Sequence, residues 1–163
     1  MGRAHLRIVA PAGLAAILVL AADQVTKSWA VDRLSRSDIH VVWTLSLVLQ
    51  YNTGSAFGLA RGWAPVVGGA AALIVVALVA AMRHVGSGTL AVALGMIVGG
   101  ALGNLADRVF RSHHGGVVDF IALHWWPTFN VADASIVVGS LFAAYLLWRA
   151  GRYDHPGAEG GWE

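Results

Sequence analysis

The sequence predicts an all-α membrane protein with four transmembrane helices and a small extracytoplasmic β element between the first and second spans. The first observation is composition: 57% of the 163 residues are hydrophobic, 12% are charged, and the mean hydropathy is +0.65. Soluble domains carry about 25% charged residues. The second is that four stretches approach the roughly 20 apolar residues that cross a bilayer. The third is that tryptophans lie near the proposed span ends, where an amphipathic ring favours the interface.

The proposed spans cover residues 6–31, 63–82, 88–106 and 131–148. Near its end the first span contains the polar stretch DQVTK, residues 23–27, which we expect to continue the helix into the interface. The alternative for the first span is a cleaved signal peptide with a basic start and an apolar core. The three later spans and the polar DQVTK favour one retained helix.

The segment between the first two spans, IHVVWTLSLVLQYNTGSAFG, is more than a simple loop. Its TLSLVLQ stretch alternates polar and apolar residues, and the segment is rich in Val, Trp and Thr, which favours one or two strands. We expect this β element to lie outside the bilayer, with its apolar side on the membrane surface.

One membrane-embedded domain is expected over residues 1–150, followed by a polar, Gly-rich tail over 151–163 that we expect to be disordered and cytoplasmic. With four spans both termini lie on one side, which we take to be the cytoplasm. The positive-inside rule does not decide this, because nearly equal numbers of Lys and Arg fall on the two sides.

Composition also excludes several functions. A pI near 9.5 could indicate nucleic-acid binding, but the formal net charge is only +2 and no basic run exceeds two residues, so no nucleic-acid partner is expected. The chain has no cysteine, which excludes disulfides, thiolate zinc sites and cysteine nucleophiles.

The third span ends in GMIVGGALGNLADRV, in which Gly95, Gly99 and Gly103 are four residues apart. Such a ridge of small residues lets a neighbouring helix approach closely. Asn104 and Arg108 are also four apart and share a helix face, with an Asp between them as an ion-pair partner. Helix packing explains the glycines, but it explains the Asn less well, because an amide near hydrocarbon needs a partner.

The stretch GGVVDFIALHWWPTFNVADAS places Asp119 and Asp133 in apolar surroundings. Carboxylates are costly in a membrane and are usually functional there. The WWP tripeptide marks the interface and prevents a continuous helix. Asn130 lies three residues before Asp133, on the same face at the start of the fourth span. Both Asp residues should therefore lie at similar depth, near one membrane surface.

Two carboxylates about 4 Å apart repel by roughly 4 kcal/mol at an effective dielectric constant near 20, which corresponds to about three pKa units. One group would keep a proton while the other stays ionised, the arrangement of aspartic proteases, which need no metal and form no covalent intermediate. Structural roles are the alternative: Asp119 could cap a turn, and Asp133 could interact with a helix dipole. Spacing alone leaves both open.

Four blocks, in order, carry a family resemblance: DQVTK at 23–27, YNTGSAFG at 51–58, GNLADRV followed by GGVVDF at 103–120, and FNVAD at 129–133. On these motifs the chain resembles the lipoprotein signal peptidases, the type II signal peptidases of bacterial membranes. The resemblance covers nearly the whole chain except its two ends.

The resemblance implies that Asp119 and Asp133 are the catalytic dyad of an aspartic endopeptidase. It implies substrate-binding or supporting roles for a larger set: Asp23, Lys27, Asn52, Gly54, Asn104, Arg108, Asn130 and Ala132. Many members have Ser where this chain has Ala134, which puts one supporting hydrogen bond in doubt, and the linker over 109–116 is longer than in many members.

The implied substrates are prolipoproteins whose lipobox cysteine carries a diacylglyceryl group, cut just before that cysteine. The implied location is the bacterial inner membrane, with multiple spans and an active site near the extracytoplasmic surface. The expected partners are these lipid-modified substrates and membrane lipids; a monomer is expected, with no cofactor and no metal.

Three other functions compete. A metalloprotease could use His113, His114 and His124, but no HExxH spacing is present. A serine protease could use Ser55, but no His lies in a span to activate it. A small transporter or proton channel could use the two Asp residues as relays, although no repeats or broken helices are visible.

Overall fold

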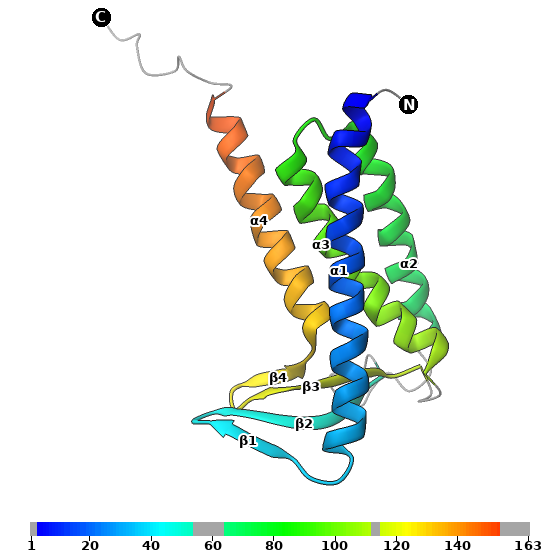
Figure 1. The fold of residues 1–163 in the computed structure, drawn as a ribbon, viewed down its shortest axis with the longest axis vertical. Helices are drawn as coiled ribbons and strands as arrows, with labels where there is room; N and C mark the ends of the chain where they lie inside the picture. Colours follow the sequence, from blue (N-terminus) through cyan, green and yellow to red (C-terminus); the bar gives the residue numbers. More distant parts are fainter. Residues whose placement is uncertain (1–2, 54–63, 112–114, 154–163) are drawn as a thin grey trace, which may run out of the picture.

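The computed structural model describes residues 3–53, 64–111 and 115–153. Figure 1 shows the helices running side by side with a sheet at one end of the bundle, while the start of α1 and the end of α4 lie at the other end. The elements in chain order are α1 (Arg3–Leu34), β1 (Ile39–Val42), β2 (Leu45–Asn52), α2 (Ala64–Ala81), the short 3₁₀ helix η1 (Met82–His84), α3 (Gly88–Phe110), β3 (Val117–Leu123), β4 (Trp126–Phe129) and α4 (Val131–Tyr153).

Three of the described helical stretches are long and apolar enough to cross a membrane: Val9–Leu34, Gly88–Phe110 and Val131–Arg152. A further apolar stretch, Gly68–His84, is shorter. Apolar side chains also cover much of the outer surface; Leu73, for example, is 73% exposed. Such a surface suits hydrocarbon and not water. The described part of the chain is mostly helical. It has three candidate membrane spans, whereas the sequence predicted four.

Glycines on α3 bring its neighbours close, as the spacing of Gly95, Gly99 and Gly103 predicted. A Cβ atom at Gly95 would collide with the backbone oxygen of Ala12 in α1, and one at Gly99 would collide with the same helix. At Gly103, however, a Cβ would collide with the carboxylate of Asp23. The third glycine thus makes room for a buried charge, and the first two for a helix backbone.

The four strands form one antiparallel sheet in the order β1-β2-β3-β4. From the sequence, β structure was predicted only between the first two spans; β3 and β4, which lie between α3 and α4, were not predicted. The reason is that β3 (VVDFIAL) begins with four successive buried residues, so it lacks the alternation that identifies a half-buried strand. In the register, Gln50 pairs with Asp119 and Asn52 with Val117.

The sheet is attached to the end of α1. Ala30 and Leu34 of α1 form a small buried cluster with Phe120 of β3. Since Phe120 directly follows Asp119, this packing fixes where the first candidate carboxylate lies.

The last helix is longer than predicted. α4 continues through Tyr153, so residues 151–153, which the sequence analysis assigned to the tail, are helical. The guanidinium of Arg152 lies 4.6 Å from the ring centre of Trp148, one turn earlier, and such a cation–π contact supports the last turn. The rest of the predicted tail, residues 154–163, lies outside the described residues.

Candidate functional site

Polar side chains are buried at the sheet end of the bundle. In the described ranges the buried charged and amide residues are Asp23, Lys27, Asp107, Asp119 and Asn130, each no more than 1% exposed. Charged residues are almost never fully buried unless they are paired. Their partners here join α1, α3, β3 and the start of α4 into one network.

Lys27 is the cation at the centre of this network. Its ammonium lies 2.9 Å from Asp23 Oδ2, 3.0 Å from Asp107 Oδ2 and 2.9 Å from Asn104 Oδ1. An ammonium has three donors, so each donor has an acceptor. Because Lys27 binds the amide oxygen of Asn104, the amide nitrogen is free to face the opposite way, toward Asp133.

Asp107 is a buried residue whose importance the sequence analysis missed, since it was taken only as an ion-pair partner on α3. Its Oδ1 accepts hydrogen bonds from Gln24 Nε2 and Arg111 Nε, both at 3.0 Å. Its Oδ2 accepts one from the backbone N–H of Val118 at 3.0 Å, besides the ion pair with Lys27. Asp107 therefore ties β3 to α3 one residue before Asp119. The sequence did carry a signal for this role of Asp107: it lies three residues after Asn104, on a neighbouring part of the helix surface.

Asp119 lies in β3 and is 1% exposed. Its Oδ1 accepts a hydrogen bond from Asn130 Nδ2 at 2.7 Å, and its Oδ2 accepts one from Asn52 Nδ2 at 3.0 Å. The pKa of Asp119 is raised to about 6: burial is the largest cause and the nearby charge of Asp133 adds to it, while the hydrogen bonds from Asn52 and Asn130 oppose the rise. Asp119 is thus a carboxyl group that exchanges a proton close to neutral pH.

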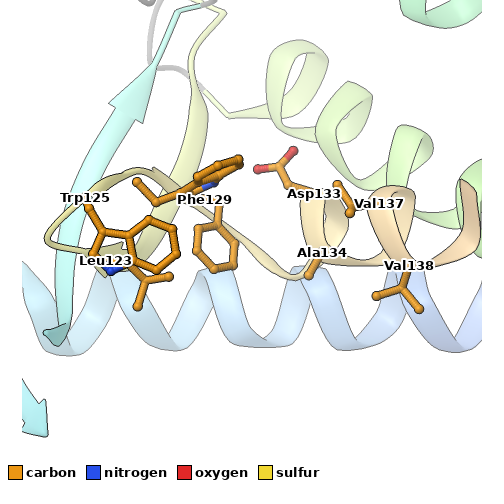
Figure 2. Close-up of a pocket in the computed structure, with 8 residues that line it drawn as sticks. Leu123, Trp125, Phe129, Asp133, Ala134, Val137 and Val138 are labelled. Carbon is orange, nitrogen blue, oxygen red and sulfur yellow. The ribbon is translucent and has the colours of Figure 1, made fainter. Parts of the chain in front are cut away.

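Asp133 lies in the first turn of α4. Asn130 Oδ1 accepts from the backbone N–H of Asp133 at 2.9 Å, and Asp133 Oδ2 accepts from the backbone N–H of Asn130 at 3.2 Å. This reciprocal pair is a capping box, which satisfies two backbone donors at the start of a helix. Asp133 Oδ1 also accepts from Asn104 Nδ2 at 2.8 Å. Figure 2 shows the Asp133 carboxyl group projecting from the start of α4 on the side away from Ala134.

The two candidate carboxylates therefore meet at Asn130. Its side-chain nitrogen donates to Asp119, and its backbone nitrogen donates to Asp133. The same side-chain nitrogen lies 3.1 Å from Asn104 Oδ1, the atom that Lys27 also binds. The arrangement can hold one carboxyl group that keeps a proton beside another that is partly exposed and ionisable, which is the requirement for acid–base work on a polar bond.

Arg108 and Ala132 complete the predicted set. Arg108 Nη1 donates to the backbone oxygen of Asn104 at 3.2 Å, and its guanidinium is close enough to interact electrostatically with Asp133 and Asp119. Its Nε is the one buried side-chain nitrogen without a hydrogen-bond partner in the described part of the chain. The backbone N–H of Ala132 donates to Asp23 Oδ1 at 2.9 Å, and Ala132 is fully buried. Asp23 thus holds the start of α4.

Other predicted residues lie outside the described ranges. Gly54 is among them, as are Ser55 of the serine-protease alternative and His113 and His114 of the metalloprotease alternative. Within residues 3–53, 64–111 and 115–153, no group of three or more His, Cys, Asp or Glu could hold a metal ion.

Two solved structures have the same fold. Both are described as bacterial membrane enzymes whose structures were obtained by the in meso method. One, at 1.9 Å resolution, is 29% identical with a TM-score of 0.76, and the match covers 85% of this chain and 93% of the other. The second, at 2.3 Å resolution, is 26% identical with a TM-score of 0.76, covering 95% and 96%.

Sequence relatives point to one family. The lipoprotein signal peptidase of Mycobacterium leprae (strain Br4923) is 42% identical over 136 residues, covering 80% of this chain and 68% of that protein. The lipoprotein signal peptidase of Mycobacterium avium (strain 104) is 43% identical over 136 residues, covering 80% and 75%. The family model of signal peptidase (SPase) II matches residues 15–149. This match spans most of the chain and contains both carboxylates that meet at Asn130, so the chain belongs to the signal peptidase II family.

Proposed function

We propose that this chain is a membrane-embedded aspartic endopeptidase that removes the signal peptide from diacylglyceryl-modified prolipoproteins, cutting just before the lipidated cysteine. Membership of the signal peptidase II family supports the removal of signal peptides from prolipoproteins. The observation that carries the aspartic mechanism is the contact of one residue, Asn130, with both Asp119 and Asp133.

In this proposal the two carboxylates have different roles. Asp119 is buried and its pKa is raised to about 6, so it is the member that carries a proton when substrate displaces water. Asp133 is partly exposed, and its carboxylate accepts two N–H groups, one from the Asn130 backbone and one from the Asn104 amide, so we assign it the role of the base that faces the attacking water. Environments that differ in this way are how paired carboxyl groups divide acid and base work.

The reaction then proceeds without a covalent intermediate. Ionised Asp133 takes a proton from water as the water oxygen attacks the carbonyl carbon of the scissile bond. Protonated Asp119 gives its proton to the carbonyl oxygen. In the second step the tetrahedral intermediate collapses, the C–N bond breaks, and the proton on Asp133 passes to the leaving nitrogen of the cysteine. The proton on the former carbonyl oxygen returns to Asp119.

We further propose a multi-pass arrangement in the bacterial inner membrane, with α2 as a fourth span. Its 18 residues rise by about 27 Å, close to the roughly 30 Å of the hydrocarbon core. The start of α1 and the end of α4 would face the cytoplasm, and the sheet would lie at the extracytoplasmic surface.

The chain has no cysteine, so His40→Cys and Arg152→Cys each introduce a unique site for a label. A membrane-impermeant maleimide added to intact spheroplasts should label the first and not the second; the opposite pattern would invert the topology.

The activity is tested on a synthetic lipobox peptide that carries a diacylglyceryl cysteine. Purified chain in lipid should cleave it just before that cysteine, and the unlipidated peptide should be a poor substrate. Asp119→Asn and Asp133→Asn should each abolish cleavage. The matched control is Asp32→Asn, because Asp32 is an exposed carboxylate near the last residue of α1, at the sheet end of the bundle. This variant should retain activity.

The same assay separates the competing functions. A chelator should leave the rate unchanged, whereas a metalloprotease would lose activity. Loss of proton flux in Asp119→Asn vesicles, with no peptide cleavage by the parent chain, would favour the transporter.

The proposal also treats the chain as a monomer, with prolipoproteins and membrane lipids as its partners. Measuring the mass of the protein in lipid nanodiscs would test the monomeric state.

A further inference from the structure

Arg111, at the point where α3 ends, is a charged residue that the proposed reaction does not use. Its backbone N–H donates to the carbonyl oxygen of Asp107 at 3.0 Å, and its own backbone is already extended. Its side chain turns back along the helix, so that Nε also lies 3.0 Å from Asp107 Oδ1. A cation is stabilised at a helix C-terminus and four residues after an acid, which is the local reason for this conformation.

The guanidinium group of Arg111 joins two helices. While its Nε binds Asp107 on α3, its Nη2 donates to Ser28 Oγ at 3.0 Å and to Gln24 Oε1 at 3.4 Å, both on α1. The donors of a guanidinium are held in one plane at fixed angles. Arg111 therefore fixes the Asp107 carboxylate relative to α1, which the single ammonium of a lysine on its flexible stem would not do.

Gln24 reinforces this connection. Its Nε2 donates to Asp107 Oδ1 at 3.0 Å, to Gly103 O at 3.1 Å and to Asp23 Oδ2 at 3.2 Å. Because the amide nitrogen faces three oxygens, the amide oxygen points the other way, toward the guanidinium of Arg111. Arg111 thus stabilises the orientation of the amide in which Gln24 donates to Asp107.

These contacts occupy one oxygen of the Asp107 carboxylate and direct the other toward the site. Oδ1 accepts from Gln24 and Arg111, while Oδ2 accepts from Lys27 and from the backbone N–H of Val118, both at 3.0 Å. A carboxylate has about four acceptor sites, so all of them are used. Since the side chain is fully buried, any rotation would leave a buried donor without its partner, which is costly.

The inner oxygen, Oδ2, is a branch point that leads to both candidate carboxylates. One branch is the N–H of Val118, the residue directly before Asp119. The other is Lys27, whose ammonium binds Asn104 Oδ1 at 2.9 Å, while Asn104 Nδ2 donates to Asp133 at 2.8 Å. A rotation at the branch point would therefore displace both carboxylates relative to each other.

We infer that Arg111 is a positioning residue for the proposed reaction: it holds Asp107 Oδ1 against α1 and thereby keeps Oδ2 directed at Val118 and Lys27. The inference rests on the proposed function. Arg111 acts through Asp107 and has no contact of its own with the reacting atoms. Its side chain is 21% exposed while that of Asp107 is 0% exposed, so a residue near the protein surface sets the geometry of a buried pair.

The first test is Arg111→Met, which removes the planar group and its charge. With the lipidated peptide, kcat should fall about tenfold to 10²-fold, because small displacements of reacting groups have effects of this size. KM should change little, because Arg111 does not bind substrate. Arg111→Lys keeps the charge without the planar group and should recover only part of kcat. The matched control is Arg33→Met, since Arg33 is an exposed arginine in the last turn of α1; its kcat and KM should match the parent chain.

A double-mutant cycle tests whether the effect passes through Asp107. In an Asp107→Asn background, Arg111→Met should cause a much smaller further loss of kcat than it causes in the parent chain. Equal fold losses in the two backgrounds would overturn the inference. So would an effect confined to KM, or full recovery of kcat by Arg111→Lys.

Amide hydrogen exchange in lipid nanodiscs provides a readout that needs no turnover. In Arg111→Met the Val118 amide should exchange about tenfold faster or more, because its acceptor is no longer held in place. The amides that pair β1 with β2 should keep the parent rates, and Arg33→Met should change neither set. An unchanged rate at Val118, or equally faster exchange throughout the chain, would overturn the inference. If the parent chain fails to cleave the lipidated peptide, the proposed function fails, and the exchange rates still decide whether Arg111 positions β3.

Discussion

The most informative perturbation is Asn130→Asp, because it changes one atom type at the point where both carboxylates meet. Asp is as good an N-cap residue as Asn, so the start of α4 keeps its acceptor for the Asp133 N–H, which lies at 2.9 Å. The amide nitrogen that donates to Asp119 at 2.7 Å becomes a carboxylate oxygen instead. The variant thus places a third carboxyl group in the site while preserving the helix cap.

The magnitude follows from that distance. Two full charges 2.7 Å apart repel by about 6 kcal/mol at an effective dielectric constant of 20, or roughly four pKa units. This is an upper bound, because the cluster relieves the repulsion by holding an extra proton. The site of Asn130→Asp should therefore stay protonated to higher pH than that of the parent chain.

The assay is the pH profile of kcat/KM on the lipidated peptide. The parent chain should lose activity as pH rises through the pKa of Asp119, about 6, because the proposed acid must be protonated. In Asn130→Asp this alkaline limb should move up by more than one pH unit, and the maximum should fall by about 10²-fold, because the carbonyl site now faces an extra acceptor. Asn130→Ser, which keeps a cap but adds no charge, should shift the limb less.

A parent-like pH profile and rate in Asn130→Asp would refute the reasoning, since they would mean that Asn130 does not contact both of the proposed catalytic groups. A shifted limb with an unchanged maximum would keep Asp119 in the role of acid but show that the added carboxyl group does not disturb the carbonyl site.

Three further predictions concern the supports of the site. Asn52→Ala removes a hydrogen bond that lowers the pKa of Asp119, so its alkaline limb should move above that of the parent chain; an unmoved limb would show that Asn52 does not act on this carboxyl. Lys27→Met leaves two buried carboxylates without their shared cation and should cost about 3–5 kcal/mol, seen as a large fall in Tm in detergent; an unchanged Tm would contradict the buried ion pairs. Gly95→Ala should also lower Tm, because its Cβ meets the backbone of α1, while Gly69→Ala, with nothing within 4 Å, should not.

Much of the site could be predicted from the sequence because its residues lie in short motifs. Helices that contact lipid are specified by their own apolar composition, and the four-residue spacing of Gly95 and Gly99 predicted a close helix approach that the contact with α1 confirms. In NVAD, the three-residue separation of Asn130 and Asp133 is a local property of a helix start, and the structure shows it as a capping box.

The rest depends on contacts between distant segments. Asn52 reaches Asp119 because β2 pairs with β3, and no local pattern specifies that register. β3 was not predicted because its buried residues do not alternate. Asp107 was taken for a simple ion-pair partner because its contacts come from distant segments: this carboxylate binds both α1 and the backbone of β3.

The sequence by itself determined the apolar helices, the buried polar motifs and the spacing that caps α4, because each follows from neighbours within a turn or two of the chain. The tertiary structure alone decided that Asp119 and Asp133 share Asn130, and that Lys27 orients the Asn104 amide that donates to Asp133. The physical reason is that a buried polar group takes its partners from whichever segment packs against it, and that packing is a property of the whole bundle and its sheet.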